Sequence, residues 1–215
     1  GYRAIRFCLE NRDIFKTQLR ALLRASIYGR LKIMFPMISG VGELQEALGV
    51  YMEAKRELDA RGIRYDKALP VGSMIEVPSA AVTLDLLSEH IQFVSIGTND
   101  LIQYLLACDR VNERIAYLYE PTHPAVARLL RHIVNTSRTT GLEVSLCGEM
   151  AGDGICLPML LGLGLRRLSL NYRTIPEIKH LARGLSAGKC QKLMDDYSGT
   201  PYAGRAAILF AKASY

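Results

Sequence analysis

The sequence predicts an α/β fold in which helices cover a parallel β-sheet. Short apolar runs, typical of strands buried on both faces, alternate along the chain with amphipathic helical segments. No tight hairpin signal separates consecutive runs, so we expect the strands to be connected through helices and to run parallel. Polar residues directly follow several of the runs, and ligands in such folds bind beyond the carboxyl ends of the strands.

The first part of the chain predicts a helix, a strand and a second helix. Apolar residues recur at helical spacing over 13–28, with Asp13 as a possible N-cap and Gly29 as the stop. The segment 31–38 is almost wholly apolar and is expected to be a buried strand. Helical spacing then resumes over 41–60.

Strands and helices are expected to alternate in the same way up to about residue 197, with a longer loop at 111–122. Five strands fit either a self-contained open doubly wound sheet or the last five strands of an eight-stranded barrel. The chain opens on a helix with no strand before it, which favours the barrel. The remaining expected strands are 70–77, 91–97, 143–149 and 166–171. The remaining expected helices are 79–90, 101–106, 124–139 and 154–165, followed by helical stretches over 176–197.

Composition excludes several classes of protein. With 215 residues, 49% of them hydrophobic, the chain can bury a core but is short for a barrel of roughly 250 residues. We expect no membrane insertion and a cytoplasmic location, because no apolar run approaches ~18 residues and the start lacks a signal-peptide core. Five scattered cysteines without a C-x-x-C pattern argue against disulfides and zinc. The net charge of +6 is dispersed, so no nucleic-acid surface is expected.

Two carboxylates stand at the ends of neighbouring predicted strands. Glu76 closes the strand at 70–77, and Asp100 follows the strand at 91–97. Each also has a simpler interpretation, Glu76 as a salt-bridge partner or helix cap and Asp100 as the cap of the next helix. Together they supply the oxygen ligands that Mg²⁺ prefers, with substrate phosphate and water completing the octahedron.

Other candidates are arginines and a cysteine. Arg110 lies in a polar loop, where a guanidinium can bind phosphate or carboxylate, although an isolated loop arginine is usually solvated. Arg3 and Arg6 are equally ambiguous candidates near the start of the chain. Cys147 lies near the end of the fourth predicted strand, where a buried cysteine is ordinarily a small core residue. If that strand persists, Glu149 points to the same side as Cys147.

Six segments, in the same order along the chain as in one family, carry a resemblance to it. They are GYRAIR (1–6), RASIYGRLKIMFPMIS (24–39), IEVPSAA (75–81), FVSIGTNDLIQY (93–104), CDR (108–110) and LCGEMAGD (146–153). They resemble the C-terminal barrel of phosphoenolpyruvate-protein phosphotransferase, enzyme I of the bacterial sugar-uptake system. The resemblance implies a TIM (β/α)8-type barrel of which about the last five βα units are present. On this basis, 1–197 is predicted to be a partial barrel domain and 198–215 a divergent or appended tail.

The resemblance also implies a function. Phosphoenolpyruvate would give its phosphoryl group to a histidine on a mobile domain and then to the carrier protein HPr, leaving pyruvate. Cys147 would act as the acid/base group at the methylene carbon of the enolate. Arg3 would line the same pocket. The implied Mg²⁺ ligands are Glu76 and Asp100, and the implied substrate-binding residues are Asn99, Asp100, Arg110 and Arg3.

Partners and alternatives follow from the same resemblance. It implies a homodimer, and contact with HPr through an N-terminal domain that is absent from this chain. None of the four histidines matches a phosphoacceptor motif. Two alternatives remain open: an inactive fragment that only binds phosphoenolpyruvate or dimerises, and the barrel of a pyruvate phosphate dikinase or phosphoenolpyruvate synthase.

Overall fold

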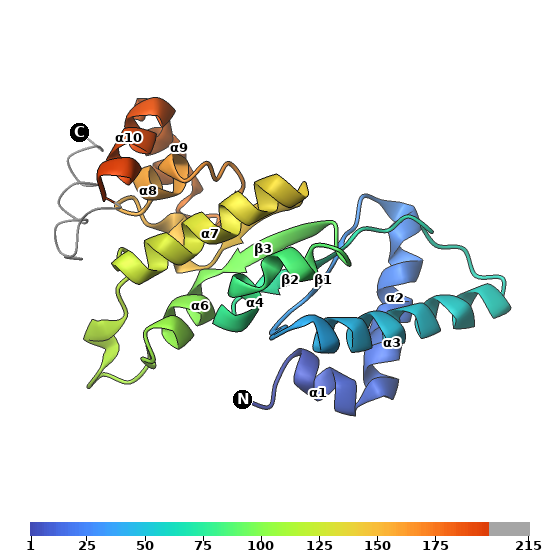
Figure 1. The fold of residues 1–215 in the computed structure, drawn as a ribbon. Helices are drawn as coiled ribbons and strands as arrows, with labels where there is room; N and C mark the ends of the chain where they lie inside the picture. The colour runs from blue at the N-terminus through green and yellow to red at the C-terminus, as the bar shows by residue number, and fades with distance from the viewer. Residues whose placement is uncertain (198–215) are drawn as a thin grey trace.

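The computed structural model describes residues 1–197, which contain one five-stranded parallel sheet (Figure 1). The predicted tail at 198–215 lies outside the described residues. The strands follow one another across the sheet in chain order, so the α/β prediction is confirmed. The sheet of the described residues is open and does not itself close into a barrel. The strands are β1 (Ile33–Phe35), β2 (Val71–Ile75), β3 (Phe93–Gly97), β4 (Glu143–Cys147) and β5 (Leu168–Ser169).

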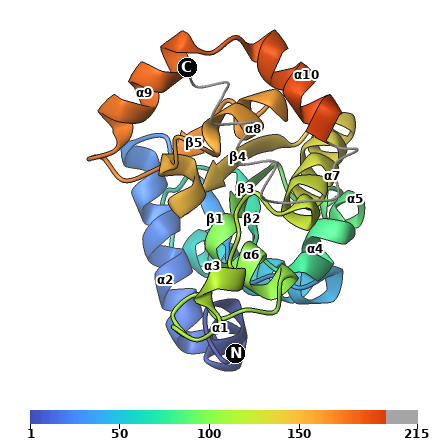
Figure 2. The ribbon, with the colours of Figure 1, turned by 90° about the vertical axis from the view of Figure 1, so that its left-hand side faces the viewer.

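Helices connect each strand to the next. Figure 1 shows α2 and α3 at one end of the molecule and α8, α9 and α10 at the other. Turned by 90°, Figure 2 shows the N-terminus beside α1 at the bottom and α9 and α10 at the top. The helices are α1 (Ile5–Glu10), α2 (Arg12–Ala25), η1 (Ser26–Tyr28), α3 (Val41–Ala60), α4 (Pro78–Val82), α5 (Leu84–Leu87), α6 (Thr98–Leu105), η2 (Ala116–Leu118), α7 (Pro124–Thr140), η3 (Glu149–Gly152), α8 (Leu157–Gly162), α9 (Ile175–Gly184) and α10 (Ala187–Tyr197).

Several predicted helix boundaries are wrong. Asn11, not Asp13, is the N-cap of α2, and Asp13 lies in the first turn, where its negative charge suits the helix dipole. The segment before α2 forms the short helix α1, which buries Ile5. The helix expected at 79–90 is divided at Thr83 into α4 and α5. The loop expected at 111–122 contains the single turn η2.

The strands are shorter than predicted. β1 stops at Phe35 because Pro36 has no N–H to continue the ladder and Met37 has a φ of 56°. β4 stops at Cys147 because Gly148, with a φ of 103°, turns the chain away. β5 has only two residues, where six were expected.

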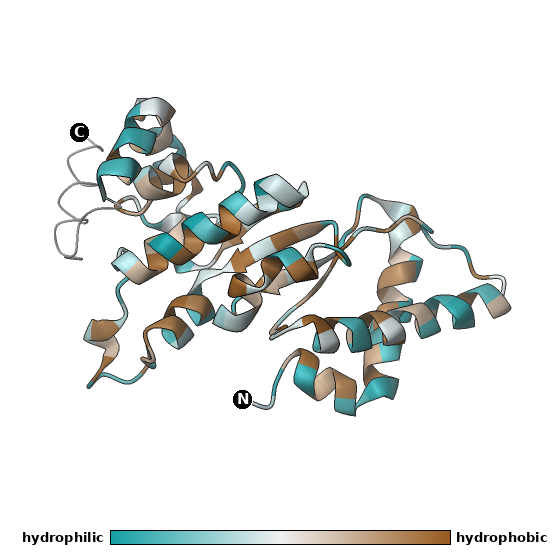
Figure 3. Ribbon diagram, viewed as in Figure 1, coloured by the Kyte–Doolittle hydropathy of each residue, from teal (hydrophilic) through white to brown (hydrophobic). Residues whose placement is uncertain are grey.

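The core lies between the sheet and its helices. β3 is buried along its whole length, and Ile75 and Ile96 are completely inaccessible to solvent. Figure 3 shows this pattern, with mainly hydrophobic strands and with helices such as α7 that carry both hydrophobic and hydrophilic residues. Within residues 1–197, every helix is either too short or too polar to cross a bilayer.

Candidate active site

The predicted site residues converge at the carboxyl ends of β2, β3 and β4. Glu76 directly follows β2, Asp100 lies in the first turn of α6 directly after β3, and Cys147 is the last residue of β4. The register aligns Ile75 with Ile96 and Gly97 with Cys147, so the three strands end on the same side of the sheet. We call this side, where the C-terminal ends of the strands lie, the carboxyl edge. Asp100 is not the N-cap of α6, because Gly97 holds that position.

Glu76 is a buried carboxylate with few partners. It is 6% exposed, and its Oε1 atom accepts a hydrogen bond of 2.6 Å from the Met37 N–H. Burial raises the pKa of Glu76, the Met37 N–H lowers it, and the negative charge of Asp100 raises it again. No ion pair within residues 1–197 reaches Glu76, so its ionised form lacks a direct cationic partner there.

Asp100 is paired with Arg3. The Arg3 Nη2 atom lies 2.5 Å from Asp100 Oδ2 and 3.3 Å from the Tyr104 hydroxyl oxygen. The same nitrogen lies 3.7 Å from the Met37 sulfur. Arg3 is therefore at the predicted site, beside both carboxylates. Arg6, the second candidate in that segment, turns away, with its Nε atom 3.8 Å from a Glu43 oxygen.

Arg110, Glu149 and Asn99 form a second polar group at the same edge. The Arg110 Nη1 atom lies 2.5 Å from Glu149 Oε1. Asn99 Oδ1 accepts the Glu149 N–H at 2.9 Å, and Asn99 Nδ2 approaches Glu149 Oε1 at 3.5 Å. Gln103 Oε1 accepts the Arg110 N–H at 3.2 Å. Asn99 and Arg110 are thus connected through Glu149.

Cys147 lies half-buried at the end of β4. Its thiol points to the Ile96 carbonyl oxygen at 3.5 Å, and its own carbonyl accepts a hydrogen bond of 2.8 Å from the Thr98 hydroxyl. Burial raises the pKa of the Cys147 thiol, Ser95 lowers it through a hydrogen bond, and the charge of Glu76 raises it. The thiol is consequently protonated at neutral pH and can donate a proton.

The sequence did not identify several neighbours of the site. Met37, Tyr104 and Tyr119 contact or face the charged residues. Met37 and Tyr104 lie within the resembling segments 24–39 and 93–104, but the sequence assigned no role to any of the three. Burial raises the pKa of Tyr119 to about 12, with the charge of Glu149 raising it and that of Arg110 lowering it. The expectation for Glu149 rested on a longer strand. β4 ends before it, and Glu149 lies instead at the start of η3.

Three non-glycine residues with positive φ lie in the segments that carry the site. They are Ala4 (54°), next to Arg3; Met37 (56°), whose N–H reaches Glu76; and Ala107 (51°), between α6 and Arg110. Such a conformation costs about 1–3 kcal/mol and persists only where the surrounding contacts impose it. Strain of this kind is common at functional sites, which supports a functional interpretation of this edge.

The donor set fits a hard divalent cation that is completed by substrate. Glu76 and Asp100 provide carboxylate oxygens. The charge of Asp100 raises the pKa of Glu76 and that of Arg3 lowers it, so a further cation bound by both carboxylates would favour their ionised forms. No group of three histidine, cysteine, aspartate or glutamate side chains in residues 1–197 could hold a metal ion. A metal here would therefore have few protein ligands and would take the rest from substrate and water, as Mg²⁺ commonly does.

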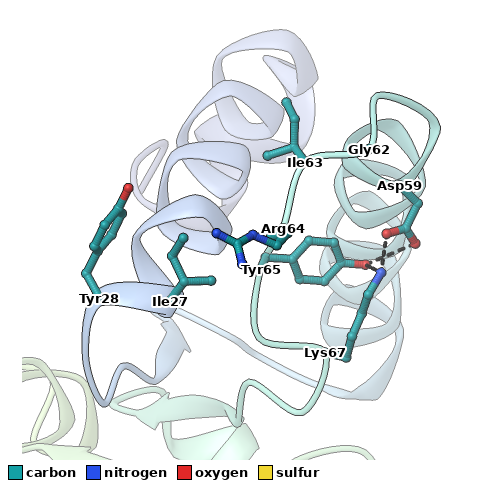
Figure 4. Close-up of a pocket in the computed structure, with 8 residues that line it drawn as sticks. All are labelled: Ile27, Tyr28, Asp59, Gly62, Ile63, Arg64, Tyr65 and Lys67. Carbon is teal, nitrogen blue, oxygen red and sulfur yellow. Dashed lines mark hydrogen bonds and ion pairs between the residues drawn. The ribbon is translucent and has the colours of Figure 1, made fainter.

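A separate cavity of about 620 Å³ lies at the opposite edge of the sheet (Figure 4). It lies where the chain enters β1 and β2, and its polar residues Asp59, Tyr65 and Lys67 bind one another. Figure 4 shows the Arg64 side chain between Ile27 and Tyr65. Because ligands of α/β sheets bind at the carboxyl ends of strands, the edge with Glu76 is the better candidate site.

Comparison with known proteins gives a consistent result. Residues 1–187 match the family model described as "PEP-utilising enzyme, PEP-binding domain". The chain is 49% identical over 195 residues to a phosphoenolpyruvate-protein phosphotransferase of Priestia megaterium, covering 91% of this chain and 34% of the relative. A protein of the same name from Bacillus subtilis (strain 168) is 53% identical over 175 residues, covering 81% and 31%. The chain thus spans about a third of the length of these relatives.

Proposed function

Because the chain belongs to the family of PEP-binding domains of PEP-utilising enzymes, we propose that it provides the phosphoenolpyruvate site of a phosphoenolpyruvate-protein phosphotransferase. The observation that carries the proposal is the meeting of two carboxylates, two arginines and one protonated thiol at the carboxyl edge of the sheet. This set matches a trianionic substrate that needs a cation, phosphate ligands and a proton donor.

Each residue has a distinct part in the proposal. Glu76 and Asp100 would hold Mg²⁺, and Arg3, Arg110, Asn99 and Asp100 would bind the substrate. When bound, Mg²⁺ would neutralise charge on the phosphoryl group and on the enolate oxygen. Arg3 now pairs with Asp100, so a cation on Asp100 would release the Arg3 guanidinium for the phosphate or carboxylate of the substrate.

The proton balance assigns a role to Cys147. Transfer of the phosphoryl group to a histidine breaks the P–O bond and leaves the enolate of pyruvate. The Cys147 thiol would give its proton to the methylene carbon, forming the methyl group of pyruvate and leaving a thiolate. The raised pKa of this thiol supports the role, because a protonated group is needed for donation.

The larger assembly is also part of the proposal. We infer that the five parallel strands belong to a (β/α)8 barrel closed by further strands of the full-length protein, with 1–197 inside the barrel domain. The phosphohistidine domain and HPr contact would lie outside this chain. The protein would act in the cytoplasm as a homodimer in sugar uptake.

The test uses the full-length protein that contains this chain, with phosphoenolpyruvate, Mg²⁺ and an HPr-type carrier. We expect phosphorylated carrier and one pyruvate per phosphoryl group transferred. Glu76→Gln and Asp100→Asn should each reduce the rate by on the order of 10²–10³-fold, because they remove charge that stabilises the transition state. Glu143→Gln, at the other end of β4, is the matched control and should retain activity.

Full activity in both carboxylate variants would overturn the metal assignment. Absence of carrier phosphorylation in the wild type, with ATP-dependent turnover instead, would favour a dikinase or synthase. For Cys147→Ala, we expect slower formation of the pyruvate methyl group, while phosphoryl exchange between phosphoenolpyruvate and the histidine continues. Equal loss of both steps would contradict proton donation by Cys147.

A further inference from the structure

We infer that Glu149 is a positioning residue that holds Arg110 in the free site and competes with the anionic substrate for its guanidinium. The inference rests on the proposed function, because it concerns phosphoenolpyruvate binding at the same site. It assigns a role to a residue that is outside the set predicted for metal, substrate or proton transfer.

The geometry around Glu149 differs from that of an ordinary surface glutamate. Its side chain is 74% exposed, yet Oε1 lies 2.5 Å from Arg110 Nη1, and Asn99 binds the same residue at the backbone and approaches its side chain. Asn99 is itself a predicted substrate-binding residue. Glu149 thus connects two groups that the substrate needs.

The backbone before Glu149 fixes this arrangement. Gly148 has a φ of 103°, and a Cβ atom there would lie 2.8 Å from Asn99 Oδ1 and would collide with the Thr98 hydroxyl. Close approach of this glycine to α6 allows the Glu149 N–H to reach Asn99. The hydrogen bond to Asn99 of α6 therefore positions the backbone of Glu149, and Arg110 contacts its exposed carboxylate.

The surroundings determine what the pair does. Tyr119 lies half-buried beside it, since the charges of Glu149 and Arg110 shift its pKa in opposite directions. The side chain of Arg110 is 34% exposed, so its charge is partly shielded from water. A phosphate or carboxylate that binds Arg110 must displace or crowd the Glu149 carboxylate, and the two anions repel each other. Glu149 consequently keeps Arg110 ordered in the free site but lowers the affinity for substrate.

The experiment measures phosphoenolpyruvate binding by titration calorimetry with Mg²⁺ present, using the full-length protein that contains this chain. Glu149→Gln keeps oxygen and N–H groups for Asn99 and Arg110 but removes the charge. We expect a Kd about 2- to 5-fold lower than that of the wild type, as for loss of a competing exposed ion pair. In steady-state assays, KM for phosphoenolpyruvate should fall by the same factor. Glu149→Asp, which keeps the charge, should return Kd toward the wild-type value.

Two controls isolate the pair. Glu143→Gln removes the same charge from an ion pair at the far end of β4 and should leave Kd unchanged. In an Arg110→Gln background, which should itself weaken binding, Glu149→Gln should add little, because the guanidinium for which it competes is gone.

The outcomes separate the two claims. If the wild type fails to bind phosphoenolpyruvate, the proposed function fails. If the wild type binds but Glu149→Gln binds equally or more weakly, the inference fails and the proposed function stands. A gain that persists without Arg110, or that Glu143→Gln reproduces, would be a general charge effect and would also overturn the inference.

Discussion

Glu76 brings a negative charge to a position where only 6% of its surface is exposed. Its pKa is raised by burial, so the folded state binds more protons than the unfolded state between the ordinary and the raised pKa. Stability therefore falls as pH rises through that window, and above it the full cost of the charge is present. This cost fits the proposed role of Glu76 as a metal ligand, because a bound cation would offset the buried charge.

Glu76→Gln tests this cost. Glutamine can still accept the Met37 N–H but carries no charge, so we expect a higher free energy of unfolding for the metal-free variant at neutral pH. Its stability should also decline less than that of the wild type as pH rises from the ordinary pKa of a glutamate through the raised pKa of Glu76. Urea unfolding of the full-length protein across that range, without metal, measures both effects. Glu143→Gln is the control, and its expected effect on stability is opposite. Lys32 and then Arg167 lower the pKa of the Glu143 carboxyl, so its charge stabilises the fold at neutral pH and its removal should lower stability. A Glu76→Gln variant less stable than the wild type at every pH would contradict the prediction.

Gly148 allows a second test at the scale of a residue. Gly148→Ala would impose a positive φ on alanine and force its Cβ against Thr98 and Asn99. We expect a loss of about 2–4 kcal/mol in the free energy of unfolding. Gly141 also has a positive φ, 76°, but no atom lies within 4 Å of a Cβ added there. Gly141→Ala should therefore lose only about 1 kcal/mol, the cost of a positive φ for alanine. Equal losses in the two variants would show that the contact with α6 is unimportant.

At the scale of elements, α8 and α10 pack closely through a glycine. A Cβ atom at Gly162 would lie 2.7 Å from Met194 Cγ and would overlap the Cys190 carbonyl oxygen of α10. This close approach secures the last described helix against the body of the fold. It also explains why the end of α8 carries a small residue.

Gly162→Ala should separate these helices. We expect a loss of about 1–3 kcal/mol in stability, together with faster proteolysis within α10, because overpacking forces the two elements apart. Gly49→Ala in α3 provides the contrast, since its Cβ would meet nothing within 4 Å. Replacing a glycine in a helix interior at such a site should increase stability by about 0.5–1 kcal/mol. Thermal unfolding of the full-length protein measures both changes, and a stabilised Gly162→Ala variant would be inconsistent with this packing.

At the scale of the molecule, β1 and β5 are the outer strands of the sheet, and each has one side without a partner strand within the described residues. Beside β5 lies a cavity of about 350 Å³ between α8 and α9, lined by a largely apolar set: Leu157, Leu161, Leu165, Arg166, Leu168, Leu170, Ile175, Ile178, Lys179 and Ala182. Unpaired strand edges and apolar surface promote association. We expect the same surfaces to be covered in the full-length protein.

The 215-residue chain expressed by itself should therefore associate or have poor solubility. Sedimentation velocity should show a mass that increases with concentration, and thermal unfolding should be broad. The full-length protein is the control, and its unfolding should be sharper. A stable monomer of the isolated chain with one sharp cooperative transition would contradict this prediction.

Local patterns predicted much of the fold. The helix expected at 41–60 matches α3 at both ends, because its apolar spacing and flanking glycines are local signals. The order of strands and helices also followed from alternating periodicity. Strand ends were less predictable, since the turns at Met37 and Gly148 depend on contacts with Glu76 and α6. Local apolarity cannot indicate where such contacts end a ladder.

The sequence by itself determined the α/β class, the parallel sheet and the residue types available at its carboxyl edge. Only the tertiary structure decided which of those residues meet. Arg3 and Asp100 are 97 positions apart, and Arg110 and Glu149 are 39 apart, yet each pair is in direct contact. From the sequence, Arg6 was as good a candidate for the site as Arg3, but its side chain lies beside Glu43 instead. Side-chain pairing across such separations depends on strand register and helix placement, which no local pattern encodes.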